Sequence, residues 1–165
     1  MTPASNKPDL RRIGESAFTE VLGTLLSLPA TVRESANDGS ASDALDPITS
    51  SVLLTGQRLS GSIHLQLPQA FVVHAVRLLT GLDGEAGNAK DLQHDAAGEL
   101  ANMVAGRVAS QLAADGYPCH LGTPSVSRTA RLPIEIQPGL HHGRTDLICE
   151  GHSLSLELQC RFAAP

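Results

Sequence analysis

Aromatic side chains are scarce in this sequence of 165 residues, which holds three Phe, one Tyr and no Trp. The core must therefore be built from Leu, Val, Ile and Ala, and stacking of aromatic rings on nucleic-acid bases is disfavoured. Positive charge is also in short supply, because 12 Lys and Arg residues stand against 17 Asp and Glu residues and give a net charge of −5. The composition argues against DNA, RNA or an anionic membrane as a partner and favours a partner protein with a basic or metal-bearing surface.

Long hydrophobic runs and paired cysteines are missing as well. No stretch approaches the roughly 18 consecutive apolar residues of a membrane span, and the opening residues MTPASNKPDLRR lack the apolar run of a signal peptide. The three cysteines, Cys119, Cys149 and Cys160, are odd in number and show no CxxC spacing, so we expect reduced thiols. These features predict a cytoplasmic protein.

The length of the chain suits one domain, because a domain of about 150 residues already buries roughly two-thirds of its unfolded surface. Residues 1–9 predict a flexible N-terminal tail, and residues 10–165 predict a single domain. The polar, Gly-containing segment 33–46 predicts a flexible connection inside that domain.

Hydrophobic periodicity places the elements. It predicts helices over 10–28, 68–80 and 95–116, strands over 50–54, 62–67, 132–137, 145–150 and 154–162, extended chain over 117–122 and 124–127, and a turn at GLHHG, 139–143. The helices lie between blocks of strands without a repeating strand–helix–strand rhythm. The predicted fold class is therefore α+β, a two-layer domain with long helices packed on one face of a largely antiparallel sheet.

The predicted helix over 95–116 has two distinct faces. Its core face repeats an apolar residue every four positions: Leu100, Val104, Val108 and Leu112. A rotation of 100° per residue gathers the opposite face from Asp95, Glu99, Asn102 and Gly106. Each glycine inside an exposed helix costs about 1 kcal/mol relative to Ala, so the glycines here suggest that another molecule approaches this face closely. Asp115-Gly116 predicts the end of the helix.

The first helix weakly repeats the residue spacing of this one, and we call the repeat the echo motif. Ser16-x-x-x-Glu20-x-x-Gly23 has the spacing of Asp95-x-x-x-Glu99-x-x-Asn102. The match is compatible with a duplicated half whose first copy lacks the carboxamide, although such short spacings also recur by chance.

The sequence resembles the CheX members of the CheC/CheX/FliY family of response-regulator phosphatases from bacterial chemotaxis. The family motif is an Asp or Ser, three residues, a Glu, two residues, an Asn, and about twenty-odd residues to a Pro. Asp95, Glu99, Asn102 and Pro124 match it, and the surroundings agree over roughly 10–162. The chain departs from the family after the proline, where SVSRTA stands in place of a segment that often contains Gly.

The resemblance implies a CheC/CheX-like fold and hydrolysis of the aspartyl phosphate of a CheY-like response regulator. Asn102 would orient the attacking water, because a carboxamide donates and accepts hydrogen bonds without adding charge. Glu99 would pair with the active-site lysine of the regulator, and an ion pair of this kind fixes the register of an interface. Residues expected to contact the partner are Asp95, Gly98, Met103, Gly106 and Pro124. An alternative role for Asp95 is only to cap or polarise the N-terminus of the helix.

The resemblance also implies that the regulator holds the Mg²⁺ ion, so that this chain binds no metal or cofactor of its own. It suggests a homodimer formed by sheet edges, which would cover exposed edge strands. Glycine at position 23 implies that the first helix has no second active site. We expect no nucleic-acid or membrane partner.

Two other functions compete with this one. The first is a non-catalytic CheX-like binding or dimerisation module of a two-component or motor-switch system, which would keep the motif without turnover. The second is a small-molecule sensor, disfavoured by the lack of aromatics and of convergent buried polar groups. A zinc site is disfavoured because His141 and His142 lie in a predicted turn, with His152 as their only close companion, and we expect all three to be solvated loop residues.

Overall fold

The computed structural model describes residues 7–34, 46–130, 132 and 134–163. Residues 1–6 of the expected tail and 35–45 of the expected connection lie outside the described residues. Lys7 to Asp9 are described, and Asp9 already belongs to the folded part, because its side chain accepts a hydrogen bond from the Arg12 backbone N–H at 3.1 Å and caps the first helix.

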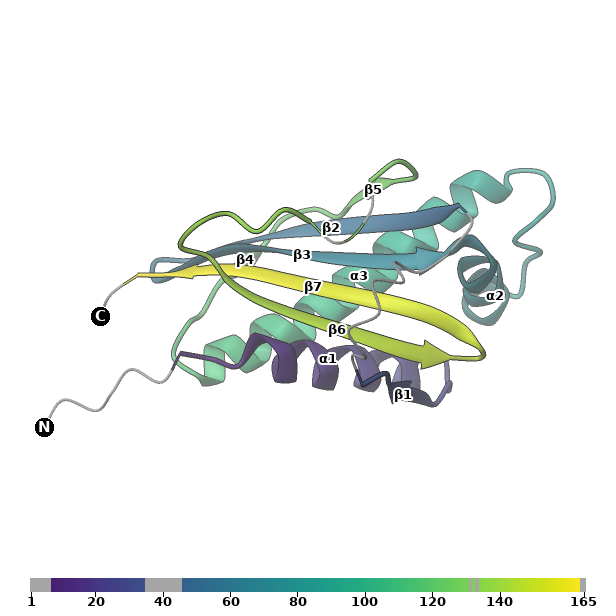
Figure 1. Cartoon of the computed structure of the whole chain (residues 1–165). Coiled ribbons are helices and arrows are strands. Elements are labelled where there is room, and N and C mark those ends of the chain that lie inside the picture. The colour runs from purple at the N-terminus through teal and green to yellow at the C-terminus, as the bar shows by residue number, and fades with distance from the viewer. Residues whose placement is uncertain (1–6, 35–45, 131, 133, 164–165) are drawn as a thin grey trace, which may run out of the picture.

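Seven antiparallel strands form one sheet in the described part of the chain (Figure 1). They are β1 (Ala30–Val32), β2 (Pro47–Thr55), β3 (Leu59–Pro68), β4 (His120–Leu121), β5 (Ser125–Ser127), β6 (His141–Cys149) and β7 (His152–Phe162). Their order is β1-β6-β7-β3-β2-β4, and β5 also pairs with β2. The four long strands β6, β7, β3 and β2 are therefore neighbours, and the short strands lie at the edges.

Three helices pack on one face of this sheet: α1 (Leu10–Leu25), α2 (Gln69–Thr80) and α3 (Ala89–Ala114) (Figure 1). Alternate residues of the long strands, such as Leu154, Leu156 and Leu158 of β7, are buried with the apolar helix faces in one core. The predicted α+β, two-layer fold class is confirmed.

Helix α3 is longer at its start than the sequence pattern predicted. It begins at Ala89, not Asp95, because Leu92 packs against the core and Gln93 is buried, donating from Nε2 to the Gly84 carbonyl at 2.7 Å. Because Gln93 is polar, it interrupts the apolar periodicity, and the sequence pattern did not predict this first part of the helix. The end was predicted correctly: Gly116 has φ of 89°, the left-handed conformation that favours glycine after a helix.

The C-terminal strands differ from prediction in two places. GLHHG is not a turn between strands, because β6 already begins at His141, which pairs with Cys160 of β7. No strand forms among the described residues of 132–137. There the backbone N–H groups bond to side chains of the sheet: Leu132 donates to Gln66 Oε1 at 2.6 Å and Ile134 to Glu157 Oε2 at 3.0 Å. Buried side-chain acceptors thus replace a strand partner.

Candidate functional site

The motif residues Glu99 and Asn102 lie exposed on α3, one turn apart, on the side of the helix that faces away from the sheet. Gly106 continues this ridge and is partly exposed. A Cβ atom at position 106 would have no other heavy atom within 4 Å, so the backbone is open on this side. The ridge therefore presents a carboxylate, a carboxamide and bare backbone together.

The two flanks of the ridge are formed by Gly98 and Met103. A Cβ atom at Gly98 would lie 3.9 Å from Pro124 Cβ and 3.6 Å from Val126 Cγ2, so the segment leading into β5 runs directly beside α3. Met103 is partly buried and packs against the core. Pro124 thus lies next to Gly98, the residue that precedes Glu99 on α3.

Neither Glu99 nor Asn102 has a side-chain hydrogen bond or ion pair within the part of the chain that the structure describes. Asp95 is also exposed, and its Oδ1 lies 3.8 Å from Nδ1 of the neighbouring His94. A capping role for Asp95 is wrong, because α3 starts six residues earlier and the N-cap position belongs to Asn88. Asp95 instead extends the exposed ridge by one turn.

The corresponding face of α1 is engaged by α3. Glu20 Oε1 lies 3.3 Å from Arg107 Nη2, and Ser16 Oγ accepts a hydrogen bond from Gln111 Nε2 at 3.4 Å. Gly23 is exposed, with open space around it. The echo motif therefore supplies contacts between helices and leaves no free acid–amide pair.

The chain after Pro124 folds without the expected glycine. Ser127 Oγ accepts hydrogen bonds from the backbone N–H groups of Thr129 and Ala130, both at 3.1 Å, and closes the turn. Arg128 then donates from Nη2 to Gln93 Oε1 at 2.9 Å. These side chains fix the segment containing Pro124 against the first half of α3.

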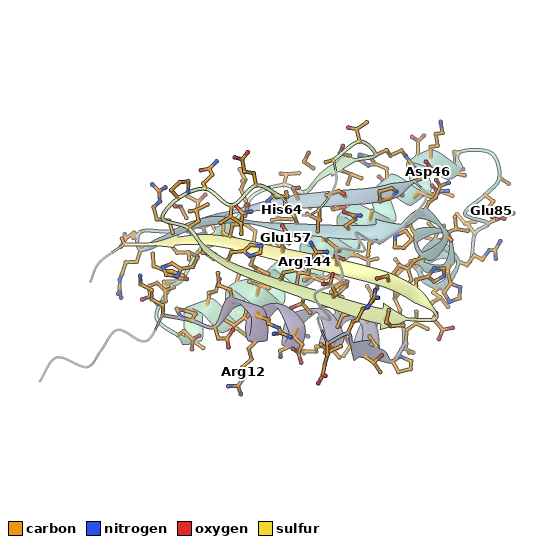
Figure 2. The ribbon with its side chains drawn as sticks, viewed as in Figure 1. Arg12, Asp46, His64, Glu85, Arg144 and Glu157 are labelled. Carbon is orange, nitrogen blue, oxygen red and sulfur yellow. The ribbon has the colours of Figure 1, made fainter. Side chains whose placement is uncertain are left out.

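A polar cluster that the sequence reasoning missed lies on the sheet face away from the helices (Figure 2). Glu157 is fully buried, and its Oε1 accepts from Arg144 Nη1 at 3.1 Å. Arg144 also pairs with Asp146 at 3.2 Å, and His142 Nε2 lies 3.7 Å from Glu157 Oε2. The claim that convergent buried polar groups are absent is therefore wrong, as is the assignment of His141 and His142 to a solvated loop. His152 is likewise a strand residue, in β7, and its ring packs edge-on against Phe71.

Two pKa values report the environment of this cluster. Burial lowers the pKa of His64, against the opposing charge of Glu157, while Ser51 Oγ and Ser62 Oγ each lie 2.8 Å from a ring nitrogen. Burial also works against the charge of Arg144, but hydrogen bonds and charge from Asp146 and Glu157 outweigh it and raise the pKa. The guanidinium is thus held between two carboxylates.

Among the described residues, no three His, Cys, Asp or Glu side chains are grouped so that they could hold a metal ion. Within the same residues, none of the helices has both the length and the apolar character needed to cross a membrane.

The two-layer fold with an exposed acid–amide helix defines a CheC/CheX-like domain. The CheX protein of Vibrio vulnificus has a TM-score of 0.77 at 17% identity, with 97% of this chain and 100% of that one covered. A structure of the CheX–CheY–BeF3–Mg complex from Borrelia burgdorferi gives 0.69 at 16% identity, covering 94% and 99%. FliY of Thermotoga maritima gives 0.57 at 22% identity, covering 99% and 92%. Likeness at these identities establishes the fold, and a comparison with curated protein sequences gives no match.

The family model described as chemotaxis phosphatase CheX matches residues 48–143, which is more than half of the chain. The chain belongs to the CheX family. The matched range contains Glu99, Asn102 and Pro124, so the resemblance inferred from the motif is confirmed at the level of the family.

Proposed function

We propose that this protein hydrolyses the aspartyl phosphate of a CheY-like response regulator. Membership of the chemotaxis phosphatase family supports the activity. The structural neighbour from Borrelia burgdorferi was solved as a complex of CheX with CheY, BeF3 and Mg²⁺, which supports the choice of partner. The single observation that carries the proposal is the exposure of Glu99 and Asn102 side by side, without internal partners among the described residues.

Asn102 is the proposed catalytic residue. Its carboxamide oxygen can accept a hydrogen bond from a water molecule, while its NH₂ group donates a hydrogen bond to another oxygen atom. The amide can therefore orient that water in line with the phosphorus without bringing negative charge against the phosphoryl group. Phosphoryl transfer depends mainly on positioning and electrostatic stabilisation, so the chain needs neither a nucleophile nor a general base of its own.

Glu99 is proposed to dock on the active-site lysine of the regulator. Its side chain has no ion pair among the described residues, and it lies on the same exposed face of α3 as Asn102. An ion pair between Glu99 and the lysine would therefore set the position of the Asn102 amide relative to the phosphoryl group. Contacts by Asp95, Gly98, Met103, Gly106 and Pro124 would complete the interface. The regulator would supply the Mg²⁺ ion and the phosphoryl group.

The setting of the activity is part of the proposal. A cytoplasmic homodimer joined through sheet edges would cover the short edge strands β1 and β4. In this arrangement the outward side of α3 would stay free for the regulator, because α3 covers a face of the sheet and does not lie at its edge (Figure 1).

The decisive experiment measures decay of a phosphorylated CheY-like regulator with Mg²⁺ and purified protein. Asn102→Ala should slow the accelerated decay about 100- to 1000-fold, the equivalent of roughly 2–4 kcal/mol for one oriented donor. Thr24→Ala is the matched control, since this exposed residue lies on α1, away from the ridge, and among the described residues its hydroxyl bonds only the Glu20 carbonyl, at 2.8 Å. Unchanged decay in the Asn102 variant would exclude the mechanism. Binding without any acceleration by the wild type would favour the non-catalytic module.

A further inference from the structure

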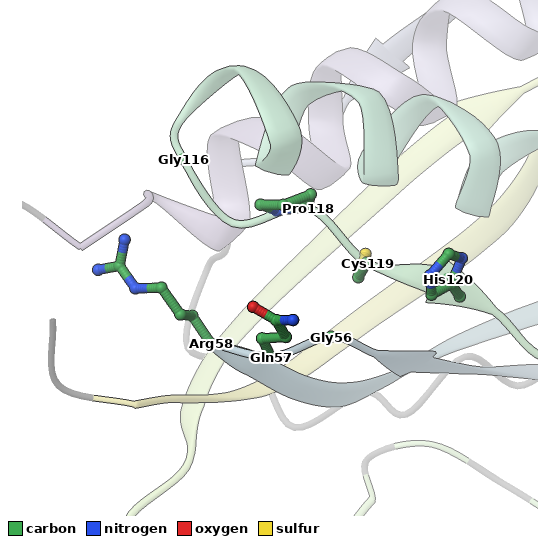
Figure 3. A pocket seen from close by; sticks show the side chains of 7 residues that line it. All are labelled: Gly56, Gln57, Arg58, Gly116, Pro118, Cys119 and His120. Atoms are coloured by element: carbon green, nitrogen blue, oxygen red, sulfur yellow. The ribbon is translucent and has the colours of Figure 1, made fainter.

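A hollow of about 650 Å³ lies at the far end of α3 from Glu99, between the turn joining β2 to β3 and the chain leading from α3 into β4 (Figure 3). It is lined by Gly56, Gln57, Arg58, Gly116, Pro118, Cys119 and His120. Its size falls within the range of small-molecule sites. Ala114 ends α3 twelve residues after Asn102, about 18 Å along the helix at 1.5 Å per residue, so this hollow is separate from the proposed catalytic ridge.

Gly56 keeps the two walls of the hollow close together. A Cβ atom at this position would collide with the Pro118 backbone carbonyl, so only glycine allows the turn to approach the opposite segment this closely. The Gly56 N–H also donates to the Leu59 carbonyl at 2.7 Å, which fixes the turn. The shape of the hollow is therefore built into the backbone of both segments.

Arg58 provides a cation at this hollow. Its guanidinium carbon lies 5.0 Å from the centre of the Tyr117 ring, and its Nε atom is shielded from solvent without a hydrogen-bond partner among the described residues. Of the other partly buried arginines that the structure describes, Arg128 donates to Gln93 and Arg144 donates to two carboxylates. A shielded donor without an acceptor lowers the free energy of unfolding, so its presence here needs an explanation.

Charge and apolar surface at the hollow indicate what would satisfy Arg58. No Asp or Glu is among the lining residues, although the chain as a whole carries a net charge of −5. Burial raises the pKa of the Cys119 thiol, so that thiol adds no negative charge. Pro118 and Cys119 give the hollow an apolar wall. An anionic group beside Arg58 with an apolar body against this wall would match both features.

We propose that this hollow binds a small organic anion, a carboxylate or phosphate ester attached to an apolar group, with Arg58 as its anchor. The guanidinium would donate to the anionic oxygens while Tyr117 holds it from behind. Gln57 and His120 would contribute further polar contacts from the two walls. The site does not depend on the phosphatase activity, and binding alone tests it.

The test is an amide NMR titration of the full chain with phenyl phosphate as probe and phenol as the uncharged control. Phenyl phosphate should shift the amide signals of Gly56, Gly116 and His120, whereas phenol should leave them in place. Arg58→Met keeps an unbranched, apolar stem without the charge and should weaken binding by at least about tenfold. Arg58→Lys should retain part of the affinity.

Arg77→Met is the matched control, because this exposed arginine lies on α2 and should not affect the titration. The proposal is overturned if phenyl phosphate leaves the lining amides unshifted, or if Arg58→Met binds it as tightly as the wild type while its spectrum elsewhere shows an intact fold. Shifts spread evenly over the exposed arginines would also overturn it.

Discussion

Arg107 of α3 holds Glu20 of α1 in an ion pair, with 3.3 Å between Nη2 and Oε1. Glu20 occupies the position in the echo motif that Glu99 occupies on α3, so the two equivalent carboxylates differ in availability. Glu99 is free within the described part of the chain, and Glu20 is not. This asymmetry restricts the proposed docking to α3.

Restoring the missing amide on α1 should not create a second active site. In an Asn102→Ala background, Gly23→Asn should leave regulator decay at the rate of Asn102→Ala alone, because Arg107 still competes for Glu20. The side chain has room, since no heavy atom lies within 4 Å of a Cβ at position 23. The measurement is the decay of the phosphorylated regulator. Recovery of fast decay would contradict the assignment of catalysis to α3 alone.

Gly106→Ala should stabilise the fold and weaken docking at once. The backbone is open at this position, so the gain in helix propensity of about 1 kcal/mol should appear in full in urea unfolding. The added methyl group would stand on the ridge and should lower the affinity for the phosphorylated regulator. Gly23→Ala is the control, with a similar stability gain on α1 and unchanged affinity. Equal affinities for all three proteins would argue against the ridge as the docking surface.

Glu157→Ala should be the most destabilising change at an ion pair of this protein. Removing a fully buried carboxylate leaves Arg144 without one partner and the Ile134 N–H without its acceptor. The free energy of unfolding should fall by about 3–5 kcal/mol. Glu20→Ala removes an exposed pair and should cost less than about 1 kcal/mol. Chemical denaturation of both variants gives the comparison. Similar losses would mean that Glu157 is not part of a structural network.

Stability should fall as the pH drops below about 6.5, the ordinary pKa of histidine, in part because of His64. Burial lowers its pKa in the folded state, so below that ordinary value the unfolded chain binds more protons and unfolding becomes easier. His64→Gln keeps a donor and an acceptor for Ser51 and Ser62 but cannot titrate there. The difference in unfolding free energy between wild type and variant, measured on both sides of pH 6.5, should therefore change with pH. A constant difference would rule out this origin.

Local periodicity was enough to predict the three helices, the hairpin β2–β3 and the outward face of α3, because each depends on residues near in sequence. It failed where distant side chains decide the structure. The backbone at Leu132 and Ile134 bonds to Gln66 and Glu157, which lie on strands remote in sequence.

The candidate site, too, was predictable only where it depends on residues near in sequence. The spacing of Glu99 and Asn102 placed both on one face of a helix, and the family motif added Pro124. The pairing of Glu20 with Arg107 needed the relative placement of two helices, and the packing of Arg58 over the Tyr117 ring needed two segments far apart in the chain. Such relationships have no local signature.

Strand β7 joins two otherwise separate halves of the sheet, because it alone connects the β1–β6 pair to the β3–β2 pair. During synthesis on the ribosome, the β2–β3 hairpin emerges long before β7, with the free hydrogen-bonding edge of β3 waiting for a neighbour. A nascent chain at this stage is prone to pair with other chains and is a natural client for chaperones. The yield of folded protein should therefore respond to how fast the segment from β3 to β7 is translated.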